Sequence, residues 1–263
     1  MGASQAGNFE VPSAQHTATL YYFEGRGLAD QIRWMMAATN VEFTQKVVKK
    51  RAKFLEMAGR QLPFGQLPLL QIDGMEIVQS QAAVRYLAKR AGLQGKSPAD
   101  ELKCDMISEA VRDILPLLLA APFRKYSATG AVPARNEEEW AAHSKLAKEK
   151  WGFIGSRLEA ILRSNLPVPK KAAVKGEVVA EPKELYLVGG GFTYADVLVA
   201  HITTWMVEEF GADVVRSMPL LVLLQNQVIS MGGVKTFIKS NNFFPVGDAA
   251  YVQQVNATLG RAV

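Results

Sequence analysis

Residues 61–93 read QLPFGQLPLLQIDGMEIVQSQAAVRYLAKRAGL and carry the clearest structural pattern in the chain. Two short apolar runs flank Asp73 and Gly74, the dipeptide that most strongly favours a tight turn between antiparallel strands. Ser80 has a side chain preferred at a helix N-cap, and the apolar residues after it repeat at helical spacing. This stretch therefore predicts a β-hairpin followed by a helix.

The residues before the hairpin predict alternating strands and helices. The run TATLYYF at 17–23 is β-branched and aromatic, which is typical of a strand. A helix is expected over 28–39, a second strand over 42–49 and a short helix over 51–60. Residues 17–93 are therefore expected to form one unit in the order β-α-β-α-β-β-α.

The pattern changes after residue 98. Long stretches with helical periodicity and no convincing strand cover residues 99–122, 137–164, 193–211 and 214–240. Ser97 followed by Pro98 marks the start of the first helix, and Thr193 with Asp196 forms a capping box at the start of the third. The predicted fold class is an α/β domain followed by an all-α domain.

The same patterns give the expected domain boundaries. Three prolines and a mixture of Lys and Glu interrupt the helices near 164–184, which we interpret as a surface insertion. We expect a flexible tail at 1–16, a first domain at 17–93, a linker at 94–98 and an all-helical domain at 99–263.

Composition narrows the classes of function. The single cysteine, Cys104, excludes an internal disulfide and favours a reducing compartment, so we expect a cytoplasmic protein. No apolar run approaches the ~20 residues that span a bilayer, so no membrane partner is expected. The net charge is +5, but the lysine clusters lack interleaved aromatics, which argues against a nucleic-acid partner. The three histidines lack the spacing of metal ligands, so no metal is expected.

The predicted order of elements is that of a thioredoxin-like domain joined to a helical domain, without the Cys-x-x-Cys of disulfide exchange. The chain resembles the cytosolic glutathione S-transferases, most closely the sigma and alpha classes. Four stretches carry this resemblance: LYYFEGRG at 20–27, LPFGQLPLLQIDG at 62–74, VQSQAAVRYLAKRAGL at 78–93 and LYLVGGGFTYADVLVA at 185–200. The resemblance implies a first domain that binds glutathione and a helical domain that forms one wall of an acceptor pocket.

Tyr21 and Tyr22 stand side by side on the first expected strand, where neighbouring side chains face opposite ways. The catalytic tyrosine of the family directly precedes the Phe of this strand, so the resemblance assigns that role to Tyr22. Tyr21 is then expected to pack on the opposite face of the sheet. A phenol that donates a hydrogen bond to a thiol sulfur favours the thiolate, which is the nucleophile.

The resemblance also implies which residues bind glutathione as co-substrate. Gln66, Leu67 and Pro68 match a family turn in which the proline is cis and the main chain of Leu67 pairs with the cysteinyl part of glutathione. Gln79 and Ser80 open the next helix, whose N-terminal N–H groups suit the γ-glutamyl carboxylate. Ser80 also fits a plain N-cap, and the two roles are compatible.

The resemblance implies further site residues at positions where this sequence matches the family pattern less closely. By similarity to the alpha class, Asp113 is expected to reach the γ-glutamyl amine of glutathione bound to the neighbouring subunit, which implies a homodimer. Arg60 is the candidate for the glycyl carboxylate. Leu28 replaces an arginine that alpha-class enzymes aim at the sulfur, so Tyr22 and Arg26 are expected to work without that help, with Arg26 among the glutathione-binding residues.

The expected activity is conjugation of the glutathione thiolate to small apolar electrophiles, a detoxification reaction. Met106 and Ala110 are expected to line the acceptor pocket, with the tail at 249–263 as a lid. Phe64 matches the aromatic that locks alpha-class dimers, although a core role fits equally well. Two alternatives stay open: a glutathione-dependent isomerase (prostaglandin D synthase-like) or peroxidase, and a non-enzymatic binding or structural protein of the same fold.

Overall fold

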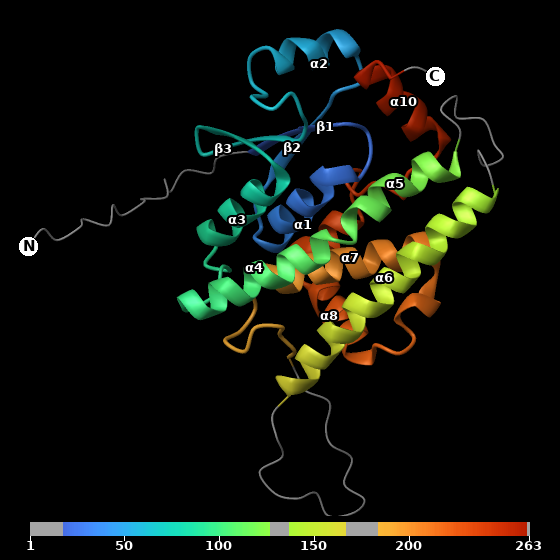
Figure 1. Ribbon diagram of the computed structural model, residues 1–263. Coiled ribbons are helices and arrows are strands. Elements are labelled where there is room, and N and C mark those ends of the chain that lie inside the picture. The colour runs from blue at the N-terminus through green and yellow to red at the C-terminus, as the bar shows by residue number, and fades with distance from the viewer. Residues whose placement is uncertain (1–17, 127–136, 167–183, 262–263) are drawn as a thin grey trace, which may run out of the picture.

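The structure is a computed structural model that describes residues 18–126, 137–166 and 184–261 (Figure 1). The tail expected at 1–16 and most of the insertion expected near 164–184 lie outside the described residues. In the described part of the chain, every helix is too short or too polar to cross a membrane.

The first domain contains a four-stranded sheet with the strand order β2-β1-β3-β4. β1 runs parallel to β2 and antiparallel to β3, and β3 and β4 are antiparallel. The elements are β1 (Ala18–Tyr22), α1 (Asp30–Ala38), β2 (Phe43–Val47), α2 (Arg51–Ala58), β3 (Leu69–Ile72), β4 (Met75–Val78) and α3 (Ser80–Arg90). This is the order β-α-β-α-β-β-α, so the predicted thioredoxin-like fold is confirmed.

β1 is an inner strand, and burial alternates along it. Leu20 and Tyr22 are buried, whereas Tyr21 is half-buried. The two tyrosines therefore face opposite sides of the sheet, as the sequence predicts. The chain leaves the end of β1 through a short loop and a 3-10 turn, Gly27–Ala29, before α1 begins.

The hairpin between β3 and β4 turns where the sequence predicts. Asp73 and Gly74 both have positive φ angles, 51° and 75°. A two-residue turn of this type needs positive φ at both positions, and Asp-Gly adopts that conformation readily. The turn fixes the register in which Leu69 pairs with Val78.

The described part of the second domain contains helices joined by loops and has no β-strand. Its helices are α4 (Pro98–Arg112), α5 (Leu115–Lys125), α6 (Glu137–Ser164), α7 (Tyr194–Phe210), α8 (Pro219–Ser230), α9 (Gly232–Ile238) and α10 (Ala249–Leu259). α7 lies at the centre, and every residue from Tyr194 to Met206 is buried (Figure 1). It packs against α1 of the first domain as well as against α4, α5 and α8.

Two long stretches that periodicity predicts as helical are each divided. Residues 99–122 form α4 and α5, because Pro116 in the first turn of α5 has no N–H to bond back to the preceding turn. Residues 214–240 form α8 and α9, which separate at Met231 before two glycines. Gly233 lies so close to the main-chain oxygen of Ala37 that a Cβ there would collide with α1.

The capping residues identified in the sequence start their helices as expected. Thr193 and Asp196 form a complete capping box at the start of α7. Asp196 also accepts a hydrogen bond from Leu187 N–H at 2.8 Å. Ser97 caps α4 by accepting a hydrogen bond from Asp100 N–H at 3.2 Å.

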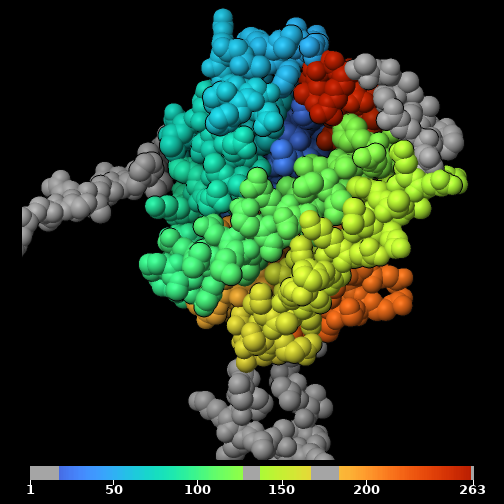
Figure 2. Space-filling view, in the orientation of Figure 1, coloured from blue at the N-terminus to red at the C-terminus, as the bar shows by residue number. Residues whose placement is uncertain are grey.

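The C-terminal helix α10 returns to the first domain, where it packs against α2 and α5. Figure 2 shows it beside the surface of the first domain. Glu24 N–H donates to Gln254 Oε1 at 3.0 Å, and Thr258 Oγ1 donates to the main-chain oxygen of Lys49 at 2.8 Å. The C-terminal segment is thereby attached to the loop that follows β1 and to the connection between β2 and α2.

Candidate active site

Tyr22 lies at the end of β1 with its hydroxyl group under the loop that follows. The Tyr22 hydroxyl accepts a hydrogen bond from Leu28 N–H at 2.9 Å, and its side chain is only 5% exposed. Gly27 has φ +48° and lies so close that a Cβ at this position would collide with the Tyr22 hydroxyl. The glycine is therefore required both for the backbone conformation and for the space that the phenol occupies.

The surroundings keep Tyr22 neutral at physiological pH. Burial raises the pKa of Tyr22 to about 12, although the Leu28 N–H and the charge of Arg33 act in the opposite direction. Because the hydroxyl oxygen already accepts from Leu28, its own proton is left to donate to another group. Tyr22 is therefore suited to donate a hydrogen bond and not to act as a base at neutral pH.

Arg33, on α1, holds the loop after β1 in place. Its Nη1 donates to the main-chain oxygens of Gly25 and Arg26 at 3.0 and 3.1 Å. Its Nε donates to Gln45 Oε1 at 3.0 Å, and Gln45 Nε2 donates to the main-chain oxygen of Leu20 at 3.2 Å. The guanidinium group is fully buried and ties α1, β1, β2 and the loop together.

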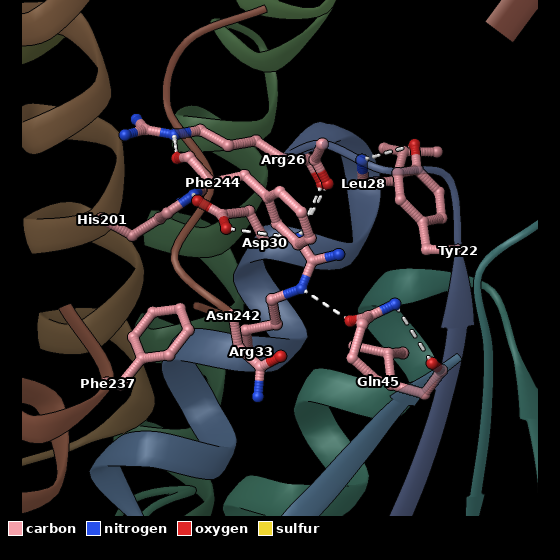
Figure 3. A network of polar contacts seen from close by, with 12 residues as sticks. Tyr22, Arg26, Leu28, Asp30, Arg33, Gln45, His201, Phe237, Asn242 and Phe244 are labelled. Carbon is pink, nitrogen blue, oxygen red and sulfur yellow. Dashed lines mark hydrogen bonds and ion pairs between the residues drawn. The ribbon is translucent and has the colours of Figure 1, made fainter. Parts of the chain in front are cut away.

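A row of polar side chains leads from α7 to Tyr22 (Figure 3). His201 Nε2 is hydrogen-bonded to Asp30 Oδ2 at 3.1 Å, and Asp30 Oδ1 lies 3.4 Å from Arg33 Nη1. Burial acts to raise the pKa of Asp30, but His201, Arg26 and Arg33 together hold this pKa below its ordinary value. Asp30 is therefore a buried carboxylate at neutral pH, and it orients Arg33 from the side away from Tyr22.

Arg26 faces the second domain. It forms an ion pair with Glu208 of α7, and its Nε donates to the main-chain oxygen of Phe244 at 2.6 Å. Its guanidinium lies 4.8 Å from the ring centroid of Phe243. The sequence places Arg26 among the glutathione-binding residues; in the structure its side chain is engaged with Glu208 and with the main chain of Phe244.

The residues of the expected glutathione-binding turn lie at the start of β3. The Leu67–Pro68 peptide is cis, as the resemblance implies, and both residues are buried. Gln66, directly before them, is exposed. The turn therefore presents Gln66 at the surface, while Leu67 and Pro68 pack inside.

One expected detail at the start of α3 is wrong. Ser80 does not cap the helix, because it lies in the first turn and the cap position belongs to Gln79, whose side chain makes no capping hydrogen bond. Gln79 is exposed and has a positive φ of 67°, a conformation that is rare for a residue other than glycine. Such backbone strain is typical of functional sites.

A cavity of about 240 Å³ lies beside the loop that follows β1. It is lined by Glu24 and Gly25 from the loop and by residues between Phe244 and Gln254 from the C-terminal segment. The ring of Tyr251 packs directly on Gly25, where a Cβ would collide with it. The C-terminal segment, which the sequence identified only as a lid, thus forms most of the cavity wall.

Met106 and Ala110 lie elsewhere. They line a groove of about 620 Å³ together with Asp113 and residues of α6, and Met106 is 64% exposed. The lining of this groove includes none of the residues around Tyr22. The structure therefore does not bring Met106 and Ala110 together with the predicted catalytic residue, because they occupy the outer face of α4.

Two further predicted residues are at the surface. Arg60 is exposed in the turn that follows α2. Asp113 is exposed at the end of α4 and lies 3.9 Å from Lys150 of α6. Among the described residues, no group of three His, Cys, Asp or Glu side chains is placed to hold a metal ion.

Sequence reasoning missed Asp30, Arg33 and His201 as members of the site. The expected helix over 28–39 has two oppositely charged residues at i and i+3, Asp30 and Arg33. Both side chains are completely buried. Burial of this kind cannot be predicted from the sequence, because charged residues near a helix start are usually exposed. The available signal was the position of Asp30 and Arg33 soon after Tyr22 in the sequence.

The fold defines a two-domain protein with a thioredoxin-like first domain and a helical second domain. Residues 18–89 match the family model of the glutathione S-transferase N-terminal domain, and residues 132–241 match that of the glutathione S-transferase C-terminal domain. Glutathione S-transferase alpha-4 of Rattus norvegicus is 30% identical over 243 residues, which cover 91% of this chain and 96% of the relative. Glutathione S-transferase A3 of Mus musculus is 30% identical over 236 residues, which cover 89% and 94%. The chain belongs to the glutathione S-transferase family, a family of transferases.

Solved structures show the same fold. Prostaglandin synthase D of Nilaparvata lugens superimposes with a TM-score of 0.63 at 23% identity and covers 86% of this chain and 98% of its own. A monomeric glutathione S-transferase of Necator americanus gives a TM-score of 0.64 at 23% identity, with coverages of 85% and 96%. At these identities the similarity concerns the fold alone.

Proposed function

We propose that this protein transfers the thiolate of glutathione to small apolar electrophiles. The observation that carries the proposal is the Tyr22 hydroxyl, which accepts from Leu28 N–H and keeps its own proton for a ligand. Family membership supports the same activity. In the reaction, the sulfur forms a bond to an electrophilic carbon, and either a leaving group departs or a proton adds at the neighbouring atom.

Tyr22 acts by stabilising the charged form of the thiol. A free thiol has a pKa of about 8.5, so only a few per cent is thiolate at neutral pH. A hydrogen bond to a charged group is worth about 1.5–3 kcal/mol, which lowers the thiol pKa by one to two units. With its own pKa raised to about 12, Tyr22 remains the proton donor in this bond throughout the neutral range.

Glutathione is held, in this proposal, by main-chain groups and a helix start. Leu67, before the cis proline, pairs with the cysteinyl part of the peptide, next to Gln66 and Pro68. Gln79 and Ser80 at the start of α3 bind the γ-glutamyl carboxylate, since a helix N-terminus attracts anions. Arg60 is exposed and free to approach the glycyl carboxylate.

The acceptor occupies the cavity between the loop after β1 and the C-terminal segment. Its volume of about 240 Å³ suits a small molecule, and the ring of Tyr251 supplies an apolar wall. The cavity adjoins Gly25, three residues from Tyr22. Large acceptors would require the C-terminal segment to move.

We also propose a cytoplasmic homodimer with a detoxification role. The groove between α4 and α6 and the exposed Phe64, Met106 and Phe153 give an apolar surface for a second copy. Asp113 lies on the edge of that groove with its side chain 67% exposed, so its carboxylate is accessible to glutathione in the partner subunit. Sedimentation of the purified protein measures the oligomeric state.

The experiment that tests the function is retention on immobilised glutathione followed by turnover of chlorodinitrobenzene. Parallel assays with an organic hydroperoxide and a prostaglandin endoperoxide separate conjugation from the peroxidase and isomerase alternatives. Conjugation that is lost in Tyr22→Phe supports the proposal. Glutathione binding without turnover of any of these substrates contradicts it and favours a non-enzymatic protein.

A further inference from the structure

A buried cation lies next to Tyr22. The guanidinium carbon of Arg33 is 5.9 Å from the centroid of the Tyr22 ring and 4.7 Å from that of Phe244. Its Nη2 is buried without a hydrogen-bond partner among the described residues. In Figure 3 a guanidinium nitrogen without a dashed line extends on the side that Tyr22 occupies. A buried donor without a hydrogen-bond partner lowers the stability of the folded state, so its presence needs a functional or structural explanation.

The charges around Arg33 are arranged asymmetrically. Asp30 contacts the guanidinium on the side away from Tyr22 and is itself hydrogen-bonded to His201 of α7. Figure 3 shows the order His201, Asp30, Arg33 and Tyr22 across the site. The positive end of this buried ion pair therefore faces the phenol, and the negative end faces the second domain.

We propose that Arg33 is the positioning residue whose charge lowers the pKa of the glutathione thiol beside Tyr22. The inference rests on the proposed function. Leu28 contacts the Tyr22 hydroxyl through a main-chain N–H and brings no charge. The buried cation that lies over the Tyr22 ring and acts on its pKa is Arg33 of α1. A positive charge near a thiol in a poorly hydrated site favours the thiolate, by an amount on the order of one pKa unit.

Other titratable groups face the same space. They are Tyr22 of β1, Arg26 of the loop, Asp30 of α1, His201 and Glu208 of α7, and Tyr251 of α10. Arg26 is paired with Glu208, and burial raises the pKa of both tyrosines, so they stay neutral at physiological pH. The field at the Tyr22 hydroxyl in the neutral range therefore depends mainly on Arg33, which favours the thiolate, and on Asp30, which opposes it.

The test measures the pKa of enzyme-bound glutathione from the ultraviolet absorbance of its thiolate. Arg33→Gln is expected to raise this pKa by about one unit and to lower kcat/KM about tenfold near pH 6.5, with recovery at alkaline pH. Arg33→Lys should restore most of the shift. Asp30→Asn should move the pKa in the opposite direction, which a purely structural role would not produce. Arg216→Gln, which removes a charge at the surface, serves as the matched control.

An unchanged thiol pKa in Arg33→Gln, with activity reduced equally at every pH, would overturn the inference and leave Arg33 a structural residue. If Arg33→Gln does not fold, Asp30→Asn provides the result: a thiol pKa that Asp30→Asn does not lower contradicts the inference. If the unmodified protein binds glutathione but shows no thiolate absorbance, the proposed function itself is contradicted. This result distinguishes a failure of the proposed function from a failure of the inference about Arg33.

Discussion

The side-chain hydroxyl of Tyr22 accepts a hydrogen bond from the main-chain N–H of Leu28 at 2.9 Å. The donor is a backbone group, so this contact does not depend on which side chain stands at position 28. Because the oxygen accepts from the loop, the phenol keeps its own proton available for the ligand in the proposed reaction. The same loop conformation depends on the positive φ of Gly27.

Replacing Tyr22 by Phe removes the proton donor and also the oxygen that accepts from Leu28 N–H. We expect the pKa of bound glutathione to rise by one to two units toward its free value, with its dissociation constant changed less than about threefold. Thiolate absorbance as a function of pH, together with calorimetric binding, measures both quantities. Tyr21→Phe is the control, because Tyr21 faces the other side of the sheet; equal thiol pKa values in the two variants would contradict the assignment.

The alkaline side of the activity profile should be flat. Burial raises the pKa of Tyr22 from 10 to about 12, so the folded protein holds this proton more tightly than the unfolded chain does. The stabilisation from this difference is present below about pH 10 and is lost as the pH rises toward 12. We expect kcat/KM to rise through the thiol pKa and then remain constant to about pH 10. A decline below pH 9 that is absent in Tyr22→Phe would show that Tyr22 ionises earlier.

Gly27→Ala should displace the phenol of Tyr22. Its Cβ collides with the Tyr22 hydroxyl, so we expect a loss of activity of at least tenfold together with reduced stability. Gly74→Ala is the matched control, because Gly74 also has a positive φ but has nothing within 4 Å of an added Cβ. Kinetics and thermal unfolding of both variants separate the collision from the backbone effect. Equal loss of activity in both variants would rule out the collision as the cause.

Tyr251 should influence the acceptor and not glutathione. Its ring lines the cavity of about 240 Å³ and packs on Gly25, so Tyr251→Ala enlarges this space. We expect the KM for small apolar acceptors to rise about tenfold, because apolar contact area is lost, while the affinity for glutathione stays within about twofold. Tyr186→Ala, which lies outside this cavity, is the control. Unchanged acceptor kinetics in Tyr251→Ala would place the acceptor elsewhere.

Asp196 should be the main polar determinant of stability at the start of α7. Its carboxylate accepts from Leu187 N–H, Thr193 N–H and the Thr193 hydroxyl, all of them buried. Asp196→Ala leaves these donors without partners, and we expect the free energy of unfolding to fall by about 3 kcal/mol. Chemical denaturation measures it, with the surface variant Asp213→Ala changing it by less than about 0.5 kcal/mol. A loss as small as that of Asp213→Ala would exclude the proposed role of the capping box.

Much of the fold follows from local patterns. The hairpin at Asp73 and Gly74, the capping box of Thr193 and Asp196, and the opposite faces of Tyr21 and Tyr22 all depend on residues near one another in the chain. Local backbone preferences and the two-residue period of a strand are enough to specify such features. The cis peptide before Pro68 followed from the family resemblance and not from spacing.

Tertiary packing decided which residues meet at the candidate site, because it joins residues that no local sequence pattern links. Asp30 and His201 are 171 positions apart, and only the docking of α1 on α7 brings them together. The same packing buries the charge of Arg33 beside Tyr22 and directs Arg26 to the C-terminal segment. It also places Met106 on the outer groove and Tyr251 at the cavity, since helical periodicity identifies an apolar face but not the surface that covers it.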